Sequence, residues 1–164
     1  MTFNTVQHVI IVNVAEMANC TFFLTGFLSV LLTSAALAAT EPTPVGVWRT
    51  VDDNTHKPRG LVRLYEQNGE IFGKIEASFD PKEVDEVCRK CGGERKGLPV
   101  LGLVIMRHMK RHGAEYSEGD ILDPDTGWVY KCKFTMDKSG RTMSVRGFIG
   151  FSLMGRSQTW YRQE

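Results

Sequence analysis

The chain has 164 residues, of which 42% are hydrophobic and 24% charged, and its formal net charge is +1 at pH 7. This length is enough for one domain with a substantial hydrophobic core. Because the charges nearly balance, the composition gives no reason to expect nucleic acid or an acidic polymer as a partner.

The first part of the chain has the pattern of an export signal. Residues 22–38 are almost wholly apolar or small, and no Lys or Arg precedes Arg49. The run ends in Ala36-Leu37-Ala38-Ala39, which has the small-x-small pattern of a secretory cleavage site. We therefore predict a signal peptide over residues 1–38, cleaved after Ala38.

Two alternatives concern this leader. Met17 could be the true start, because its free amino group would supply the positive charge that the leader otherwise lacks. An uncleaved anchor is the competing interpretation, but an apolar stretch of about 17 residues is short for a bilayer span, which needs roughly 20. Cleavage leaves one domain, residues 39–164, with no stable membrane span. It removes one acidic residue, Glu16, and no basic residue, so the net charge becomes about +2.

The first half of the mature chain alternates between short strand patterns and turn residues. Strands are predicted over 45–51, 61–66 and 70–77, and Asn68-Gly69 between the last two is a strong hairpin signal. Residues 81–87 have the composition of about one helical turn. Residues 98–109 form an apolar run whose end the pattern does not assign, and residues 106–111 could turn helical.

The second half continues the same pattern. A strand ends over 120–123, and residues 123–127 have the composition of a tight turn. Residues 128–136 alternate most clearly, with an apolar face made of Trp128, Tyr130, Cys132, Phe134 and Met136. Further strands are predicted over 141–149 and 157–162. About eight antiparallel strands without a long helix predict an all-β fold, a small closed barrel, with an open sandwich as the alternative.

Both ends of the mature domain carry tryptophan motifs. Gly46-Val47-Trp48 at the first strand is similar to the signature that opens the lipocalin barrel, in which a Trp plugs the closed end and an Arg from the last strand packs over it. Trp160-Tyr161-Arg162 supplies the C-terminal partner, and Arg162 or Arg156 is the candidate for a cation–π contact. We interpret Trp48 and Arg162 as structural residues.

Further motifs point to one family. They are Asp52-Asp53, the Cys-x-x-Cys loop, Ile121-Leu122-Asp123-Pro124-x-x-Gly127-x-x-Tyr130-x-Cys132, and Arg146-Gly147-Phe148-Ile149-Gly150-x-x-x-x-Gly155-Arg156-x-Gln158-x-Trp160-x-Arg162. Together they resemble the secreted bacterial proteins grouped as domain of unknown function 2147. The resemblance covers residues 44–162. It implies a lipocalin-like barrel, export to the periplasm or the cell exterior, and an apolar ligand, but no particular activity.

Cys88-Arg89-Lys90-Cys91 allows three interpretations. A local disulfide between Cys88 and Cys91 is favoured in an oxidising compartment. A redox-active pair is the second, although the βαβ unit typical of thioredoxin-like enzymes is missing from the sequence pattern. Zinc is the third, because Cys88-x2-Cys91-x16-His108-x3-His112 approximates finger spacing, but its inner gap exceeds the usual run of about 12–15. We predict no metal and no other cofactor.

The third mature cysteine, Cys132, lies on the apolar face of its strand. A buried free thiol is the favoured interpretation. Pairing with Cys88 or Cys91 remains open, because spacing alone does not exclude it.

A ligand site is predicted inside the barrel. Arg146 and Arg156 flank glycines, and an inward-facing Arg could bind the carboxylate of a fatty acid. A one-residue slip in register would exchange the two faces of any strand, so the prediction depends on the assumed facing. The apolar residues expected to line the pocket are Leu61, Tyr65, Ile75, Tyr130, Phe134, Val145 and Ile149.

The sequence contains no Gly-x-Ser-x-Gly, phosphate loop or His-Glu-x-x-His motif. We therefore expect an exported, periplasmic or secreted, non-enzymatic barrel that binds a small hydrophobic or amphipathic molecule such as a fatty acid. One alternative is an envelope structural or interaction protein with a filled barrel. The other is thiol–disulfide exchange at Cys88 and Cys91.

Overall fold

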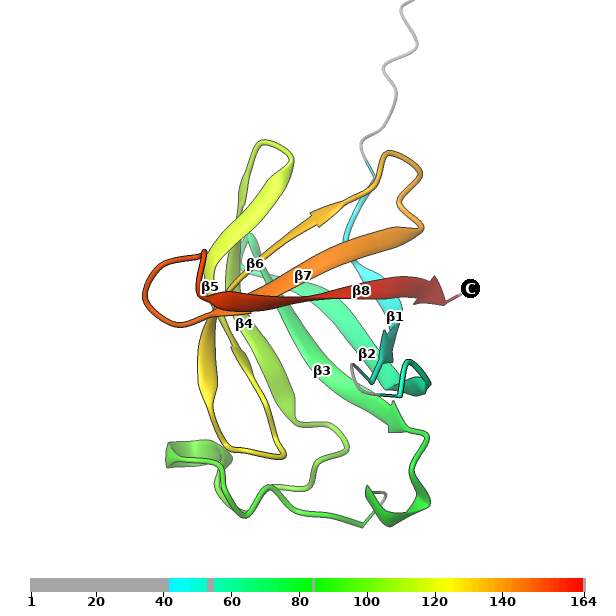
Figure 1. The fold of residues 1–164 in the computed structure, drawn as a ribbon, viewed down its shortest axis with the longest axis vertical. Helices are drawn as coiled ribbons and strands as arrows, with labels where there is room; N and C mark the ends of the chain where they lie inside the picture. Colours follow the sequence, from blue (N-terminus) through cyan, green and yellow to red (C-terminus); the bar gives the residue numbers. More distant parts are fainter. Residues whose placement is uncertain (1–41, 53–54, 84, 164) are drawn as a thin grey trace, which may run out of the picture. The chain divides into compact units, whose positions relative to one another are not determined.

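The computed structural model of the protein describes residues 42–52, 55–83 and 85–163. Within them, antiparallel strands form one closed barrel (Figure 1). The predicted signal peptide over residues 1–38, and the choice of Met1 or Met17 as its start, lie outside the described residues. In the part of the chain that the structure describes, no helix is long and apolar enough to cross a membrane.

Each strand of the barrel pairs with the next in the chain, and β8 closes on β1 through Val47 opposite Gln163 and Trp48 opposite Arg162. Closure leaves no exposed sheet edge. The predicted all-β barrel is therefore confirmed, and the open sandwich is excluded. The strands are β1 (Gly46–Val51), β2 (Pro58–Gln67), β3 (Glu70–Ser78), β4 (Val104–His112), β5 (Glu115–Leu122), β6 (Val129–Met136), β7 (Thr142–Phe148) and β8 (Gly155–Gln163).

Alternation along β6 builds one wall of the core, as its sequence predicts. Cys132 and Phe134 are buried, whereas Lys131 and Thr135 are exposed on the other face. Trp128 differs from the prediction, because it precedes the strand and its exposed fraction is 59%. The turn over residues 123–127 extends to it, since the Asp123 amide donates to the carbonyl of Trp128 at 2.9 Å.

The end of the apolar run becomes a strand, because β4 begins at Val104 whereas residues 98–103 belong to the preceding connection. The alternative of a helical turn over 106–111 is wrong. Met106 and Met109 are both buried although they are three residues apart, which is a helical spacing. The cause is a bulge. Ile71 pairs with Met109 and Gly73 with Met106, so three steps along β4 face two along β3, and His108 has a positive φ of 56°.

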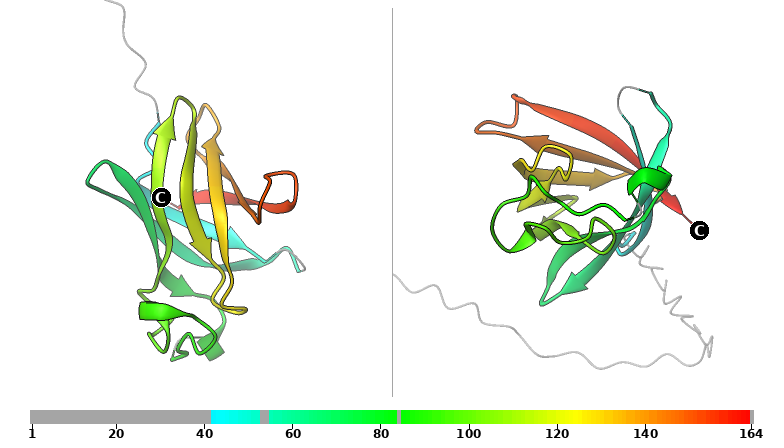
Figure 2. Two further views of the ribbon diagram at one scale, coloured as in Figure 1. Left: turned by 90° about the vertical axis from the view of Figure 1, so that its left-hand side faces the viewer. Right: turned by 90° about the horizontal axis from the view of Figure 1, so that it is seen from below.

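The up-and-down order places the connections at two ends of the barrel (Figures 1 and 2). We call one end the closed end; it carries residues 42–45 and the short turns at 68–69, 113–114 and 137–141. The other is the open end, with connections 52–57, 79–103, 123–128 and 149–154. The longest of these, 79–103, contains single 3₁₀ turns at Pro81–Glu83 and Gly93–Arg95 and lies at the bottom in Figure 1. The first of these turns falls within the predicted helical turn.

Arg162 seals the closed end over Trp48. The Trp48 side chain is fully buried, and the Arg162 guanidinium carbon lies 4.4 Å from the centre of its ring. Arg162 Nε donates to the carbonyl of Gly140 at 2.7 Å, Nη1 donates to that of Val45 at 3.1 Å, and Nη2 donates to that of Thr43. One side chain thus ties the lead-in to β1 to the β6–β7 turn.

Candidate functional site

A cavity of about 1030 Å³ occupies the open half of the barrel. Every strand contributes residues to its wall, together with the connections at the open end. Its size is at the upper end of the range of about 300–1,000 Å³ that small-molecule sites occupy. The cavity is therefore the barrel interior itself, open toward one end.

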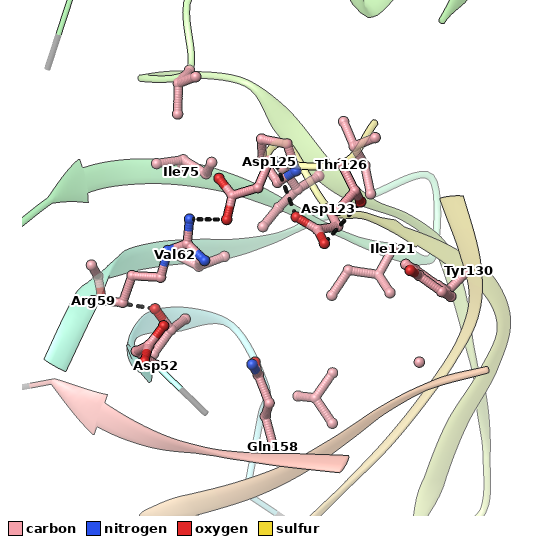
Figure 3. Close-up of a pocket in the computed structure, with 18 of the residues that line it drawn as sticks. Asp52, Arg59, Val62, Ile75, Ile121, Asp123, Asp125, Thr126, Tyr130 and Gln158 are labelled. Carbon is pink, nitrogen blue, oxygen red and sulfur yellow. Dashed lines mark hydrogen bonds and ion pairs between the residues drawn. The ribbon is translucent and has the colours of Figure 1, made fainter. Parts of the chain in front are cut away.

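The strand portions of the wall are mainly apolar, because the inward faces of the strands carry aliphatic and aromatic side chains. Gln158 and the Tyr130 phenol add polar groups to this wall (Figure 3), and Gln158 Oε1 accepts from the Trp160 indole at 3.2 Å. The apolar residues of this wall include Val62, Ile75, Ile105, Ile121, Val145 and Trp160.

Bulky side chains that do not line the cavity fill another part of the barrel. Phe134 stacks on Tyr116 with ring centres 4.6 Å apart, and Leu64, Met143 and Trp48 are fully buried. The interior is thus packed around these residues and hollow where smaller aliphatic side chains and glycines such as Gly60 and Gly147 line it. The difference in side-chain volume decides where a ligand can enter.

Gly147 helps to keep the hollow part open. Gly147 lies on the inward face of β7, two positions after Val145 on the same face, and it pairs with Arg156 of β8. A Cβ atom at this position would lie 3.5 Å from Ile121 and from Tyr130, which is ordinary contact distance. Any longer side chain would project into the cavity.

A charged network lies at the mouth, and Figure 3 shows its Arg59 and Asp125. Arg59 Nη2 on β2 contacts Asp125 of the β5–β6 turn at 2.6 Å and Glu83 of the β3–β4 connection at 3.3 Å. The hydroxyl of Ser78 donates to Glu83 at 2.7 Å. Burial alone would lower the pKa of Arg59, but the hydrogen bond and charge of Asp125 and the charges of its other acidic neighbours raise it. The network therefore ties two connections to the rim.

The structure pairs Cys88 with Cys91 in a disulfide whose Cα atoms lie 5.4 Å apart. Their exposed fractions are only 1% and 3%, because the loop packs on the β5–β6 turn. Cys88 Sγ is 3.5 Å from the carbonyl oxygen of Pro124, and Lys90 Nζ donates to the carbonyl of Asp125 at 2.7 Å. Thiol–disulfide exchange requires access to a sulfur, so this burial disfavours the exchange interpretation.

The zinc arrangement does not form. Cys88 and Cys91 are bonded to each other, and His108 Nδ1 lies 2.8 Å from Glu70 on the outside of the barrel. His112 contacts Glu118 at 3.2 Å. In the described part of the chain, no group of three potential metal ligands comes together.

Cys132 is a free thiol in the barrel interior, with an exposed fraction of 1%. Burial raises its pKa to about 12, and the negative charge of Asp120 acts in the same direction. The pairing of Cys132 with the loop cysteines, which spacing left open, is therefore absent.

Most, though not all, of the predicted ligand residues reach the cavity. Tyr65 lies on the outer face and stacks on Phe72 at 5.9 Å, because Leu64 takes the inward position and alternation places its neighbour outside. Phe134 is buried outside the cavity wall, and Arg146 faces outward toward the β7–β8 connection. The predicted residues that line the cavity are Leu61, Ile75, Tyr130, Val145, Ile149 and Arg156.

Sequence reasoning did not identify Arg59, Gln158 or Gly147 as cavity residues. Arg59 follows Lys57-Pro58, which has the composition of a turn, although the strand already begins at Pro58. Gln158 could have been found, because it shares the inward face of β8 with Trp160 under a period of two.

An up-and-down barrel of eight strands, closed by a Trp–Arg contact at one end and hollow at the other, is a lipocalin-like barrel. The model of the family described as uncharacterized proteins conserved in bacteria (DUF2147) matches residues 46–162, and the chain belongs to that family. Protein HP1028 from Helicobacter pylori, described as belonging to the lipocalin family, has a similar structure. Its TM-score is 0.67 at 16% identity, over 75% of this chain and 84% of that chain. No curated protein matches the chain in sequence.

Proposed function

We propose that the protein is an exported, non-enzymatic carrier that binds one small hydrophobic or amphipathic molecule of the fatty-acid or lipid-like class. The observation that carries the proposal is the cavity of about 1030 Å³, with an apolar wall and a charged mouth. Apolar wall area stabilises a hydrocarbon chain by about 25 cal/mol per Å² removed from water. The proposal has no catalytic step.

The mouth favours an amphipathic ligand over a wholly apolar one. Arg156 lies on the inward face of β8 at the rim, four positions from Trp160 in the wall. A guanidinium at the rim can bind a carboxylate or phosphate through paired hydrogen bonds while the chain occupies the apolar part.

Export is supported by two features. The run that ends in Ala36-Leu37-Ala38-Ala39 has the secretory pattern, and the disulfide of Cys88 with Cys91 is of a kind that persists in oxidising compartments. We therefore place the carrier in the periplasm or outside the cell.

The test uses Gly147→Leu, which fills the cavity from β7. Because the Leu side chain occupies space that the ligand needs, the affinity for cis-parinaric acid, a fluorescent fatty acid, should fall by about 10- to 100-fold. Ser144→Leu is the matched control, because Ser144 is exposed on the other face of the same strand, and it should bind as the wild type does.

Native mass spectrometry of the exported wild-type protein, purified without detergent, complements the titration. An added mass that denaturation releases would identify the ligand class. The proposal is wrong if the wild type carries no adduct and does not bind the probe, or if Gly147→Leu, folded by circular dichroism, binds with unchanged affinity.

A further inference from the structure

The β7–β8 connection exposes a concentrated set of large apolar side chains. The exposed fractions are 53% for Ile149, 81% for Phe151, 91% for Leu153 and 75% for Met154. Single exposed apolar residues are common on protein surfaces, but four within six residues mark an interaction site. Figure 1 shows this segment, residues 149–154, extending away from the strands. We call it the apolar loop.

The apolar loop is held in its exposed position. Arg146 on the outer face of β7 donates from Nε to the carbonyl of Ser152 at 2.7 Å and from Nη2 to that of Leu153 at 3.1 Å. Within the loop, the Ile149 amide donates to the carbonyl of Met154 at 3.3 Å. These bonds fix the backbone while its apolar side chains face water, so their exposure is built into the hairpin.

Basic residues lie on the strands beside the base of the loop. Arg146 is on β7, two residues before the strand ends at Phe148, and Arg156 follows Gly155 at the start of β8. The three hydrogen bonds of Arg146 all end on uncharged oxygens, including Ser157 Oγ, so they leave its positive charge in place. On β6, exposed Lys131 lies opposite Phe148, and Lys133, which also contacts Glu115, lies opposite Arg146.

We propose that the apolar loop docks the protein on a bilayer rich in anionic phospholipid. The apolar side chains at the tip of the loop match the acyl chains of a bilayer, and the basic residues beside its base match the negatively charged headgroups. No charged residue occurs from Ile149 to Gly155, so the whole tip can enter the interface without burying a charge. A protein partner would need an apolar groove, and nothing on this chain favours one.

The apolar loop is also continuous with the cavity. Ile149 and Met154 line the cavity mouth as well as the outer surface. A docked loop therefore brings the mouth to the acyl-chain boundary, where a lipid-like ligand can enter or leave without crossing water. This transfer step rests on the proposed carrier function, whereas docking does not.

The test measures binding of the full chain to phosphatidylglycerol vesicles and phosphatidylcholine vesicles by co-sedimentation. Burial of one such side chain is worth about 1.5–3 kcal/mol, so the double variant Phe151→Ser/Leu153→Ser should bind phosphatidylglycerol vesicles at least about 100-fold more weakly. The wild type should bind phosphatidylcholine vesicles weakly. Salt at 0.5 M should reduce binding to the anionic vesicles, because it shortens the electrostatic screening length to about 4 Å.

The matched control is Phe79→Ser/Leu98→Ser, which changes the same residue types at positions whose exposed fractions are 49% and 45%, outside the loop. It should bind vesicles as the wild type does. Docking is overturned if the wild type does not bind anionic vesicles, or if both double variants lose binding equally. Docking on a bilayer is also overturned if the wild type does not bind vesicles but forms a concentration-dependent dimer that only Phe151→Ser/Leu153→Ser abolishes. That result would identify a second copy of the chain as the occupant of the apolar loop.

Binding of cis-parinaric acid in solution separates docking from the carrier function. Phe151→Ser/Leu153→Ser should keep its affinity for the probe while it loses vesicle binding, which supports docking as an independent property. Vesicle binding without any probe binding would remove the carrier function and the transfer step, and would still support docking.

Discussion

At the scale of single residues, Arg162 joins three segments at the closed end of the barrel. It covers the Trp48 ring and donates to the carbonyls of Gly140, Val45 and Thr43. A cation–π contact contributes about 0.5–2 kcal/mol, and a hydrogen bond from a charged group about 1.5–3. The contacts act together, so their contributions do not simply add.

Arg162→Ala should lower the free energy of unfolding by about 3 kcal/mol, because it removes the ring contact and three hydrogen bonds, and leaves the carbonyl of buried Gly140 without this donor. Arg162→Lys keeps the charge but cannot reach three carbonyls at once, so it should lose most of the same stability. Urea denaturation measures both. Arg141→Ala, at an exposed position, is the control; an equal loss there would contradict the role of Arg162.

The buried thiol of Cys132 leads to a second prediction at the scale of single residues, on its reactivity and on alkaline stability. Its burial raises the pKa to about 12, so at pH 8 the folded thiol should resist iodoacetamide and react only in denaturant, which the protein mass reports. The folded pKa lies above the unfolded one, so the associated stability is complete below about pH 9 and is lost as the pH rises toward 12. Cys132→Ala should flatten this alkaline slope. Rapid labelling of the native protein would contradict the burial.

At the scale of elements, the β3–β4 connection is bound to the rim at separate points. Arg59 contacts Glu83 near its start, and Lys90 donates to the carbonyl of Asp125 in the disulfide loop. Gly127 lies so close to the Lys90 carbonyl that a Cβ atom there would clash with it. The disulfide thus stiffens a segment that covers part of the mouth.

Replacing both Cys88 and Cys91 by Ala should act mainly on this connection. A cross-link over such a short loop restricts the unfolded chain by only about 2 kcal/mol, so the barrel should still fold. Trypsin should then cut at Arg89 and Lys90 faster than in the wild type, as limited proteolysis with mass analysis would show. Unchanged cleavage, with the barrel intact by circular dichroism, would mean that the packing on the β5–β6 turn alone holds the loop.

The elements also differ in how well the sequence predicts them. β6 alternates without interruption, so its period of two identifies both the strand and its buried face from Tyr130 onward. β4 contains a bulge at His108, which places Met106 and Met109 on one face at a helical spacing. A bulge depends on the partner strand, and the residues of one strand do not record it.

At the scale of the whole molecule, the number of strands and their closure follow from sequence, but the size of the cavity does not. The volume depends on which side chains meet between strands, such as Phe134 of β6 with Tyr116 of β5 where it is filled, and Gly147 of β7 near Tyr130 of β6 where it is hollow. Those pairs are distant in sequence. The facing of β2 depends on such partners too. The sequence predicts that Tyr65 faces inward, whereas Leu64 takes the inward position and Tyr65 lies on the outer face.

The ladder that seals the barrel joins its first strand to its last. Trp48 lies opposite Arg162, so the residue that covers the Trp ring is on the last strand of the barrel and is synthesised after all its other strands. Contacts this distant in sequence form slowly, because the whole intervening chain must be ordered before they add stability. Until then the edge of β1 remains unpaired and its tryptophan uncovered. The barrel therefore cannot close until β8 has been synthesised, and the contact that covers Trp48 forms after every other strand of the barrel has been made.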